Sequence, residues 1–175
     1  MGMSALIQKI VETPLGEMVA VVHHDALVLL EFTDRIRMSE QMSTLSRWLP
    51  GKIREGSHPT LSLLEQELSA YFARDIKQFS VPVSLHGTEF QVQVWNGLLS
   101  IPYGSTLSYG DLADRVHRPD AQRAVGKANG DNRIAILVPC HRVVAKSGVL
   151  QGYAGGLDRK RSLLDLEQGA VGLFG

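Results

Sequence analysis

Two residues capable of nucleophilic chemistry are adjacent in this chain, Cys140 and His141, within the run Ile136–Val144. Cys140 is the only cysteine among 175 residues, so the chain can form neither an internal disulfide nor a metal cage of several cysteines. The chemistry open to it is that of a single nucleophile, activated by a base that takes the thiol proton. A buried thiol without chemistry is the alternative interpretation, because free cysteines are common in protein cores.

The apolar run before Cys140 predicts a strand that ends at Pro139, and strand-to-loop junctions commonly carry reactive groups. Neighbouring residues in a strand point to opposite faces. We therefore expect His141 to act on Cys140 through a water molecule or a bend in the chain rather than by direct contact.

Positive charge gathers around this thiol. The chain has no net charge, yet residues 115–161 hold ten basic and three acidic residues, a net charge of +7 against −7 for the remainder. This division indicates an anionic partner at the Cys140 end, although a solvated basic surface without a partner would look the same.

The composition, with 44% hydrophobic and 21% charged residues, is that of a globular protein. No apolar run approaches the roughly 20 residues that span a bilayer, and residues 1–5 lack the features of a signal peptide. We expect no membrane association. A lone thiol suits a reducing compartment, so the expected location is cytoplasmic.

The N-terminal half is predicted to be a small antiparallel sheet with helices. Runs rich in β-formers predict three strands, at residues 6–11, 18–22 and 26–32. Helical spacing predicts helices at 40–48 and 60–72. A further strand at 79–85 would lie at an edge, because Pro82 cannot donate to a ladder.

The C-terminal half is predicted to be mainly helical. Apolar spacing predicts helices at residues 88–100, 108–116, 121–129 and 157–167, the first three capped by Thr88, Ser108 and Asp120. The second and third of these helices have the outline of a helix-turn-helix. The third is poor in bulky side chains, so it can approach another surface closely; close packing inside the protein is the alternative.

Short segments from residue 103 onward, in order and spacing, resemble the O6-alkylguanine-DNA alkyltransferases, also called methylated-DNA–protein-cysteine methyltransferases. The residues that carry the resemblance are Tyr103-Gly104, Ser108-Tyr109-Gly110, Arg123-Ala124-Val125-Gly126, Ala128-Asn129-Gly130, Pro139-Cys140-His141-Arg142-Val143-Val144 and Gly152-Tyr153-Ala154-Gly155-Gly156.

This resemblance covers about residues 88–168. It implies a ribonuclease-H-like α/β domain with a small antiparallel sheet at residues 1–86, packed on a mostly helical domain at residues 87–175. The second domain would bind DNA and contain the helix-turn-helix and the acceptor cysteine.

The implied activity is direct-reversal DNA repair. A methyl or other alkyl group would move irreversibly from O6-alkylguanine, and from O4-alkylthymine, to Cys140. The protein would bind the minor groove of duplex DNA and flip the nucleotide out. Each molecule would act once, because the thioether product has no good leaving group.

The resemblance also implies roles for individual residues. Cys140 would accept the alkyl group and be linked through water to His141 and Glu167. Asn132 would tie the recognition helix to the active-site segment, and Tyr109 would assist nucleotide rotation and donate a hydrogen bond to guanine.

The residues implied to hold the flipped base are Val143, Tyr153 and Ala154. Arg123 would fill the gap left in the duplex. The DNA-contacting set expected around it is Ala121, Ala124, Gly126, Lys127 and Arg142.

The expected partner is double-stranded DNA containing alkylated guanine, bound by a chain that is a monomer in solution; cooperative assembly on DNA is left open. The chemistry needs no metal or organic cofactor. No structural zinc is expected in the N-terminal half, which has no cysteine and only scattered histidines. Three positions depart from the family pattern, namely Arg133, Gln151 and Ala154.

Three other interpretations compete with repair. A thiol hydrolase could use Cys140, His141 and Asn132, although an adjacent cysteine and histidine are poor geometry for a direct pair. A DNA-binding regulator without chemistry would not need Cys140. A larger sensor would add a cysteine-rich regulatory domain, which this chain lacks.

Overall fold

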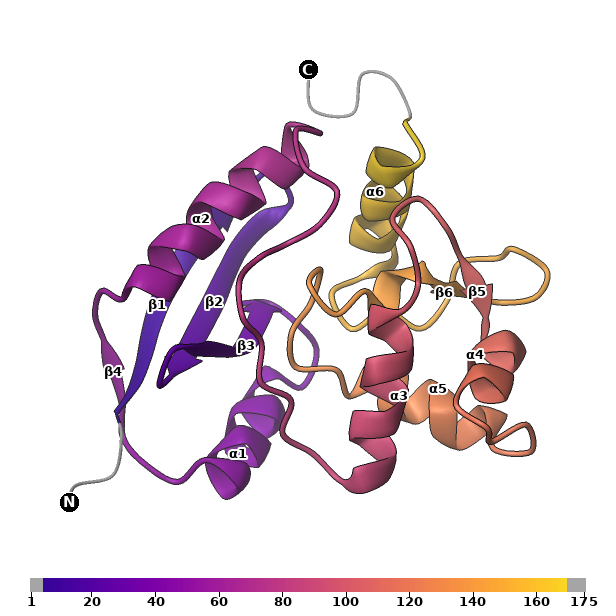
Figure 1. The fold of residues 1–175 in the computed structure, drawn as a ribbon, viewed down its shortest axis with the longest axis horizontal. Helices are drawn as coiled ribbons and strands as arrows, with labels where there is room; N and C mark the ends of the chain where they lie inside the picture. Colours follow the sequence, from indigo (N-terminus) through magenta and orange to yellow (C-terminus); the bar gives the residue numbers. More distant parts are fainter. Residues whose placement is uncertain (1–4, 170–175) are drawn as a thin grey trace. The chain divides into compact units, whose positions relative to one another are not determined.

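Residues 5–169 are described by the structure, a computed structural model, and they separate into two units at the boundary between His86 and Gly87 (Figure 1). None of the helices in this described range is both long and apolar enough to cross a membrane.

The first unit is built on a four-stranded sheet in the order β3-β2-β1-β4. The three predicted strands are confirmed as β1 (Leu6–Thr13), β2 (Gly16–His23) and β3 (Ala26–Phe32), joined as antiparallel neighbours. A fourth strand, β4 (Ile53–Glu55), pairs in parallel with β1. The expected antiparallel sheet is therefore wrong: the sheet is mixed, because a helical crossover returns the chain to the β1 edge.

Helices α1 (Met38–Trp48) and α2 (Pro59–Phe72) confirm the two predicted helices. Leu45 and Leu49 join one apolar cluster with Val19 and Val21 of β2. Side chains alternate along a strand, and β2 is buried at every position from Met18 to Val22, so both faces of the sheet are covered.

The edge strand predicted at 79–85 is absent as a regular strand. An isolated parallel bridge joins Val83 to Leu27 instead. In this bridge the Leu27 N–H donates to the Pro82 carbonyl, and the Ser84 N–H donates to the Leu27 carbonyl. Pro82 supplies an acceptor but no donor, so the ladder does not extend.

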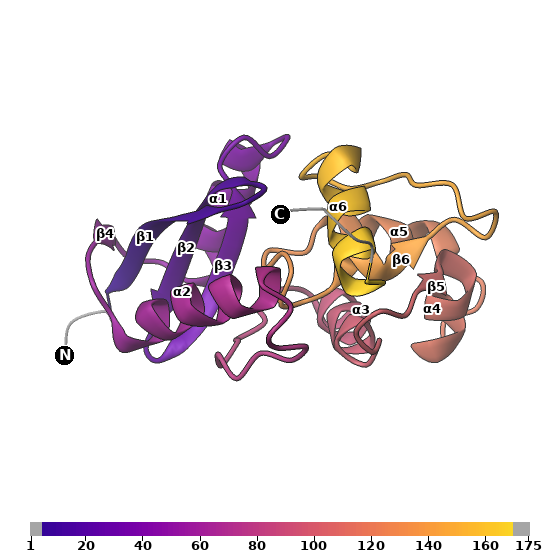
Figure 2. The ribbon, with the colours of Figure 1, turned by 90° about the horizontal axis from the view of Figure 1, so that it is seen from above.

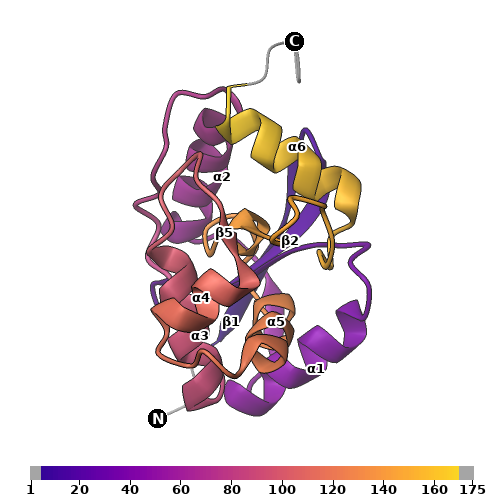
Figure 3. The same cartoon turned by 90° about the vertical axis from the view of Figure 1, so that its right-hand side faces the viewer.

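The second unit is mainly helical, as expected. Its helices are α3 (Glu89–Leu99), α4 (Tyr109–Arg115), α5 (Gln122–Gly130) and α6 (Leu157–Glu167). Thr88 and Ser108 cap α3 and α4 as predicted, and Thr88 forms a capping box with Gln91. Figure 3 shows α4 and α5 beside each other next to α3.

The start of α5 differs from the expectation. Ala121 occupies the cap position, and no side chain closes the first turn, so Asp120 is not the cap. The long loop between Val144 and α6 runs outward and returns to the start of α6 (Figure 2).

A buried acid in the first unit makes its stability depend on pH. Glu31 of β3 is 4% exposed and pairs with Arg35 at 3.0 Å and with Gln41 at 3.4 Å. Burial raises the pKa of this carboxyl to about 7, against the opposing influence of Arg35 and Gln41. The folded chain therefore holds a proton that the unfolded chain has already released.

Stability supplied by Glu31 is fully present below its unfolded pKa and is lost as pH rises toward 7. We expect the free energy of unfolding to lose up to about 3 kcal/mol from this group between pH 5 and pH 8. Urea unfolding of the wild type and Glu31→Gln across this range measures the effect. The variant should show the flatter profile, and two parallel profiles would refute this assignment.

Candidate active site

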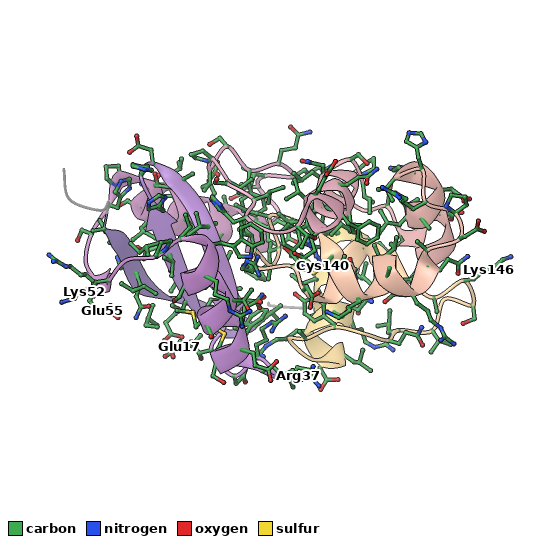
Figure 4. All side chains as sticks on the ribbon, turned by 90° about the horizontal axis from the view of Figure 1, so that it is seen from below. Glu17, Arg37, Lys52, Glu55, Cys140 and Lys146 are labelled. Atoms are coloured by element: carbon green, nitrogen blue, oxygen red, sulfur yellow. The ribbon has the colours of Figure 1, made fainter. Side chains whose placement is uncertain are left out.

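Cys140 lies in a tight turn rather than in a strand. Residues Cys140–Arg142 form one turn of 3-10 helix, followed by β6 (Val143–Val144), which pairs in parallel with β5 (Leu107–Ser108). The expected strand ending at Pro139 is wrong, so the rule that neighbours point to opposite faces does not apply at Cys140 and His141. Figure 4 shows Cys140 among the side chains that fill the molecule, and it is 8% exposed.

Asn132 holds the segment that leads to this turn. Its Nδ2 donates to the Val138 carbonyl at 2.9 Å, and the Cys140 N–H donates to the same carbonyl at 2.8 Å. Its Oδ1 accepts from the Ile134 N–H at 3.0 Å. These bonds support a strained backbone, since Ile136 has φ +71°, which is unusual for a β-branched residue. Asn132 thus positions Cys140 through the backbone.

Glu167 is the centre of a buried ionic cluster. Its side chain is fully buried at the end of α6; Oε2 lies 2.8 Å from His141 Nε2, and Oε1 lies 2.8 Å from Arg142 Nε. The Gly104 N–H donates weakly to Oε1 at 3.4 Å. Burial alone would raise the pKa of Glu167, but the hydrogen bonds and charges of His141 and Arg142 outweigh it and hold the pKa well below its usual range. Glu167 is therefore a carboxylate.

His141 is held in its neutral form. Burial lowers the pKa of the imidazole, and this outweighs the opposing effect of Glu167. Because Nε2 faces the carboxylate, it carries the proton and donates, which leaves Nδ1 as an acceptor. That buried Nδ1 has no hydrogen-bond partner within residues 5–169. A neutral histidine with a free acceptor nitrogen is suited to receive a proton.

Arg142 was expected to contact DNA, and its position leads us to reassign it. Its side chain is 9% exposed, with Nε and Nη2 on Glu167 and Nη1 donating to the Ile101 carbonyl at 2.6 Å. All three guanidinium nitrogens thus bind groups inside the protein, and the Arg142 charge neutralises that of Glu167. It also lies over the Tyr103 ring, 5.8 Å from the centroid.

A second cluster meets at the Gln151 carbonyl. The Tyr109 hydroxyl donates to it at 3.3 Å, and Lys160 Nζ donates to it at 2.7 Å. Burial raises the pKa of Tyr109, and the nearby charge of Cys140 raises it further, so the hydroxyl remains a donor. Burial lowers the pKa of Lys160, while Cys140 opposes that shift. The charge of Cys140 thus raises the pKa of both side chains, in addition to the larger effect of burial on each.

Sequence reasoning missed Lys160, which is fully buried. The signal was present: Lys160, Leu163, Leu164 and Glu167 follow the i, i+3, i+4, i+7 spacing of one helix face, and all four are buried. A lysine on such a buried stripe is uncommon and calls for a partner or a function.

The other predicted residues fall into two groups. Val143 is fully buried beside the Cys140 turn, and Tyr153 and Ala154 are half-buried in the loop before α6. On α5, Arg123, Ala124 and Lys127 are exposed and Gly126 is half-buried, as is the cap residue Ala121.

In the part of the chain that the structure describes, no group of three or more histidine, cysteine or acidic side chains is arranged to hold a metal ion.

Comparison with known proteins finds consistent similarities. The family described as 6-O-methylguanine DNA methyltransferase, DNA binding domain, matches residues 89–169. The methylated-DNA–protein-cysteine methyltransferase of Mycobacterium tuberculosis is 45% identical over 160 residues, covering 90% of each chain. The inducible protein of that name from Bacillus subtilis is 47% identical over 121 residues, or 69% of this chain and 68% of the relative.

Solved structures agree with these sequence matches. A crystal structure of Mycobacterium tuberculosis OGT in complex with DNA has a TM-score of 0.79 at 40% identity, covering 94% of this chain and 93% of the other. The O6-methylguanine-DNA methyltransferase of Pyrococcus kodakaraensis has a TM-score of 0.62 at 25% identity, with 93% and 98% covered.

Removing the Glu167 charge should strongly destabilise the protein. In Glu167→Gln the Arg142 guanidinium stays buried without its counter-ion, so we expect a loss of about 3–5 kcal/mol in the free energy of unfolding. Denaturant unfolding at pH 7 measures it.

Glu65→Gln is the matched control, because Glu65 forms an ion pair with Lys9 at 2.6 Å in which both side chains are about 40% exposed. That change should cost less than about 1 kcal/mol. If both variants lose the same free energy of unfolding, the buried Glu167 ion pair is no more important for stability than the exposed Glu65 pair.

Proposed function

Because this chain belongs to the methylated-DNA–protein-cysteine methyltransferase family, we propose that it repairs DNA by moving the alkyl group of O6-alkylguanine onto the sulfur of Cys140. The observation that carries this proposal is the neutral His141, anchored by Glu167 and adjacent in the chain to the only cysteine. Its Nδ1 is buried and has no hydrogen-bond partner among the described residues. A soft nucleophile beside a buried proton acceptor is what displacement at an alkyl carbon requires.

In the first step His141 accepts a proton. The Cys140 thiol proton passes, through a bridging water, to Nδ1, and the imidazolium that forms is stabilised by the Glu167 carboxylate at 2.8 Å. A thiolate and an imidazolium replace two neutral groups, so the total charge is unchanged.

In the second step the thiolate attacks the alkyl carbon. The carbon–sulfur bond forms as the carbon–oxygen bond breaks. Guanine leaves as an anion and takes up, through water, the proton that His141 held, so the imidazole returns to its neutral form. The product at Cys140 is a thioether, which water does not displace, so each chain acts once. The Tyr109 hydroxyl, kept protonated by burial, donates a hydrogen bond to the departing base.

Lys160 favours both negative charges that form in the reaction, the Cys140 thiolate and the departing guanine anion. Its buried ammonium is anchored on the Gln151 carbonyl and interacts with Cys140, so it favours the thiolate over the thiol. The same positive charge favours departure of an anionic base.

We assign DNA binding to the second unit. We assign a helix-turn-helix role to α4 and α5, with α5 approaching the minor groove of duplex DNA. The exposed side chains of Arg123, Ala124 and Lys127 support this assignment, since small residues permit close approach and basic residues contact phosphates.

A base within a duplex cannot reach a thiol that is 8% exposed, so the nucleotide must be flipped out. Arg123 would fill the gap in the stack. Val143 and the loop containing Tyr153 and Ala154 would hold the extruded base, with O4-alkylthymine as a second substrate. We also propose that the first unit has a ribonuclease-H-like plan, and that one chain acts on each lesion.

The transfer itself should be visible by mass. Mixing the protein with duplex DNA carrying one O6-methylguanine should add a single methyl-sized mass to the peptide containing Cys140, with a yield that saturates at one methyl per chain. Cys140→Ser and an unmethylated duplex should both give no addition. Repeated turnover, or methylation of another peptide, would contradict the proposal.

Removing the Lys160 charge should make the thiol less acidic. In Lys160→Met the pH at half-maximal reaction of Cys140 with iodoacetamide should rise by about one unit, and Lys160→Arg should restore part of the shift.

Lys146→Met is the control for this measurement, because Lys146 is exposed in the loop after β6 and extends away from Cys140 (Figure 4). If the wild type and Lys160→Met show the same pH dependence of the iodoacetamide reaction, Lys160 does not make the Cys140 thiol more acidic.

A further inference from the structure

An acid occupies an unfavourable position at the end of α5. Asp131 follows the last turn of this helix, and its N–H donates to the Lys127 carbonyl at 2.9 Å. The C-terminal end of a helix carries a partial negative charge, which repels a carboxylate. The stability of the helix therefore gives no reason for an acid at this position.

Two side chains bind the Asp131 carboxylate. Lys127 Nζ donates to Oδ2 at 3.0 Å, and Gln91 Nε2 donates to the same oxygen at 3.3 Å. Gln91 is itself fixed in the capping box of α3, where its Oε1 accepts from the Thr88 N–H at 2.9 Å. Helices α3 and α5 pack against each other (Figure 3). The bond from Gln91 can therefore keep the carboxylate in place whether or not Lys127 stays on it.

Lys127 is the mobile partner of this pair. Its side chain is 79% exposed, against 35% for that of Asp131. An ion pair exposed to this degree adds little to stability, because water and salt screen it and the long side chain loses freedom. Lys127 can thus leave Asp131 at little cost when another anion is offered. The pair is suited to exchange of partners rather than to support of the fold.

The exchange would take place on the face of α5 that we assign to DNA. Arg123, Lys127 and Asp131 follow one another at intervals of four residues, so they lie along one side of the helix. The acid reduces the net charge of this stripe from +2 to +1. A phosphate attracts the Lys127 ammonium and repels the Asp131 carboxylate. Each contact of Lys127 with a phosphate must therefore replace its contact with Asp131.

We propose that Asp131 restrains Lys127 and thereby weakens the binding of this chain to undamaged duplex DNA. On DNA, Lys127 exchanges the carboxylate for a phosphate, while Gln91 keeps the carboxylate beside α3. Weaker binding shortens the time spent at each undamaged site, which suits a protein that searches long duplexes for a rare lesion. This inference rests on the DNA-binding role proposed for α5, and it adds a function for an acid within a basic surface.

The test is a double-mutant cycle on the affinity for an undamaged duplex. Equilibrium binding of a fluorescent duplex is measured from about 50 to 200 mM salt for the wild type, Asp131→Asn, Lys127→Met and the double variant. Asparagine keeps the oxygen that accepts from Gln91 and removes the charge. We expect Asp131→Asn to bind about three- to tenfold tighter at the lowest salt, and its affinity to fall more steeply with salt.

The second arm of the cycle isolates the role of the lysine. In the Lys127→Met background, Asp131→Asn should produce about half of this gain or less, because no restrained ammonium is left to release. The same gain with and without Lys127 would overturn the proposal. Asp131→Glu, which keeps the charge, should bind as the wild type does, and far-UV circular dichroism checks that each variant is folded.

Glu12→Gln is the matched control, because it removes one negative charge from an exposed position of β1. Its effect on the affinity should be less than about twofold, since it leaves the Asp131–Lys127 pair intact. An equal gain in Glu12→Gln and Asp131→Asn would show that net charge alone controls binding, and would overturn the proposal. Unchanged affinity in Asp131→Asn would also overturn it.

Methyl transfer separates this inference from the proposed function. Transfer from O6-methylguanine to Cys140 is measured in parallel with the binding experiment. If transfer occurs but Asp131→Asn binds the undamaged duplex no more tightly, this inference alone fails. If the wild type neither binds a duplex nor accepts the methyl group, the proposed function fails, and this inference fails with it.

Discussion

The buried carboxylate of Glu167 is the interaction on which the rest of the site depends. One ionised acid at the end of α6 binds His141 and Arg142, two consecutive residues of the Cys140 turn, and it also receives the Gly104 N–H. Because the Glu167 side chain is fully buried and that of Arg142 is 9% exposed, removing either charge leaves the other uncompensated. This arrangement joins α6 to the turn and selects the tautomer of His141 that leaves Nδ1 free.

The same constraint explains features of the sequence that carry no chemistry. Gly104 has φ +78°, and a Cβ there would lie 3.1 Å from the Glu167 carbonyl, so a side chain would push the end of α6 away. Ile136 accepts a left-handed conformation because Asn132 bonds the backbone on both sides of it. Strain before the nucleophile is thus balanced by buried hydrogen bonds.

Helix α5 has an exposed face and a buried face of different composition. Its exposed side chains, Arg123, Ala124 and Lys127, suit contacts that are independent of sequence. Its buried side, formed by Val125, Ala128 and Asn129, packs inside the second unit. The small residues on this helix allow other groups to approach it closely, as the Tyr109 ring does at Gly126.

Much of this protein could be predicted from its sequence, because local patterns decide local structure. The three strands of the first unit, the helices α3 and α6 and the caps Thr88 and Ser108 follow from periodicity and capping residues. The lone cysteine beside a histidine also indicated where the chemistry lies. What failed depended on distant residues: the three-residue β4 exists only by pairing with β1, and the Cys140 turn exists because Asn132 and Glu167 hold it. Lys160 and Arg142 were misjudged because a sequence shows charge but not burial. Only the folded chain, which buries Glu167, decides that Arg142 neutralises an acid and that the buried Lys160 donates to the Gln151 carbonyl.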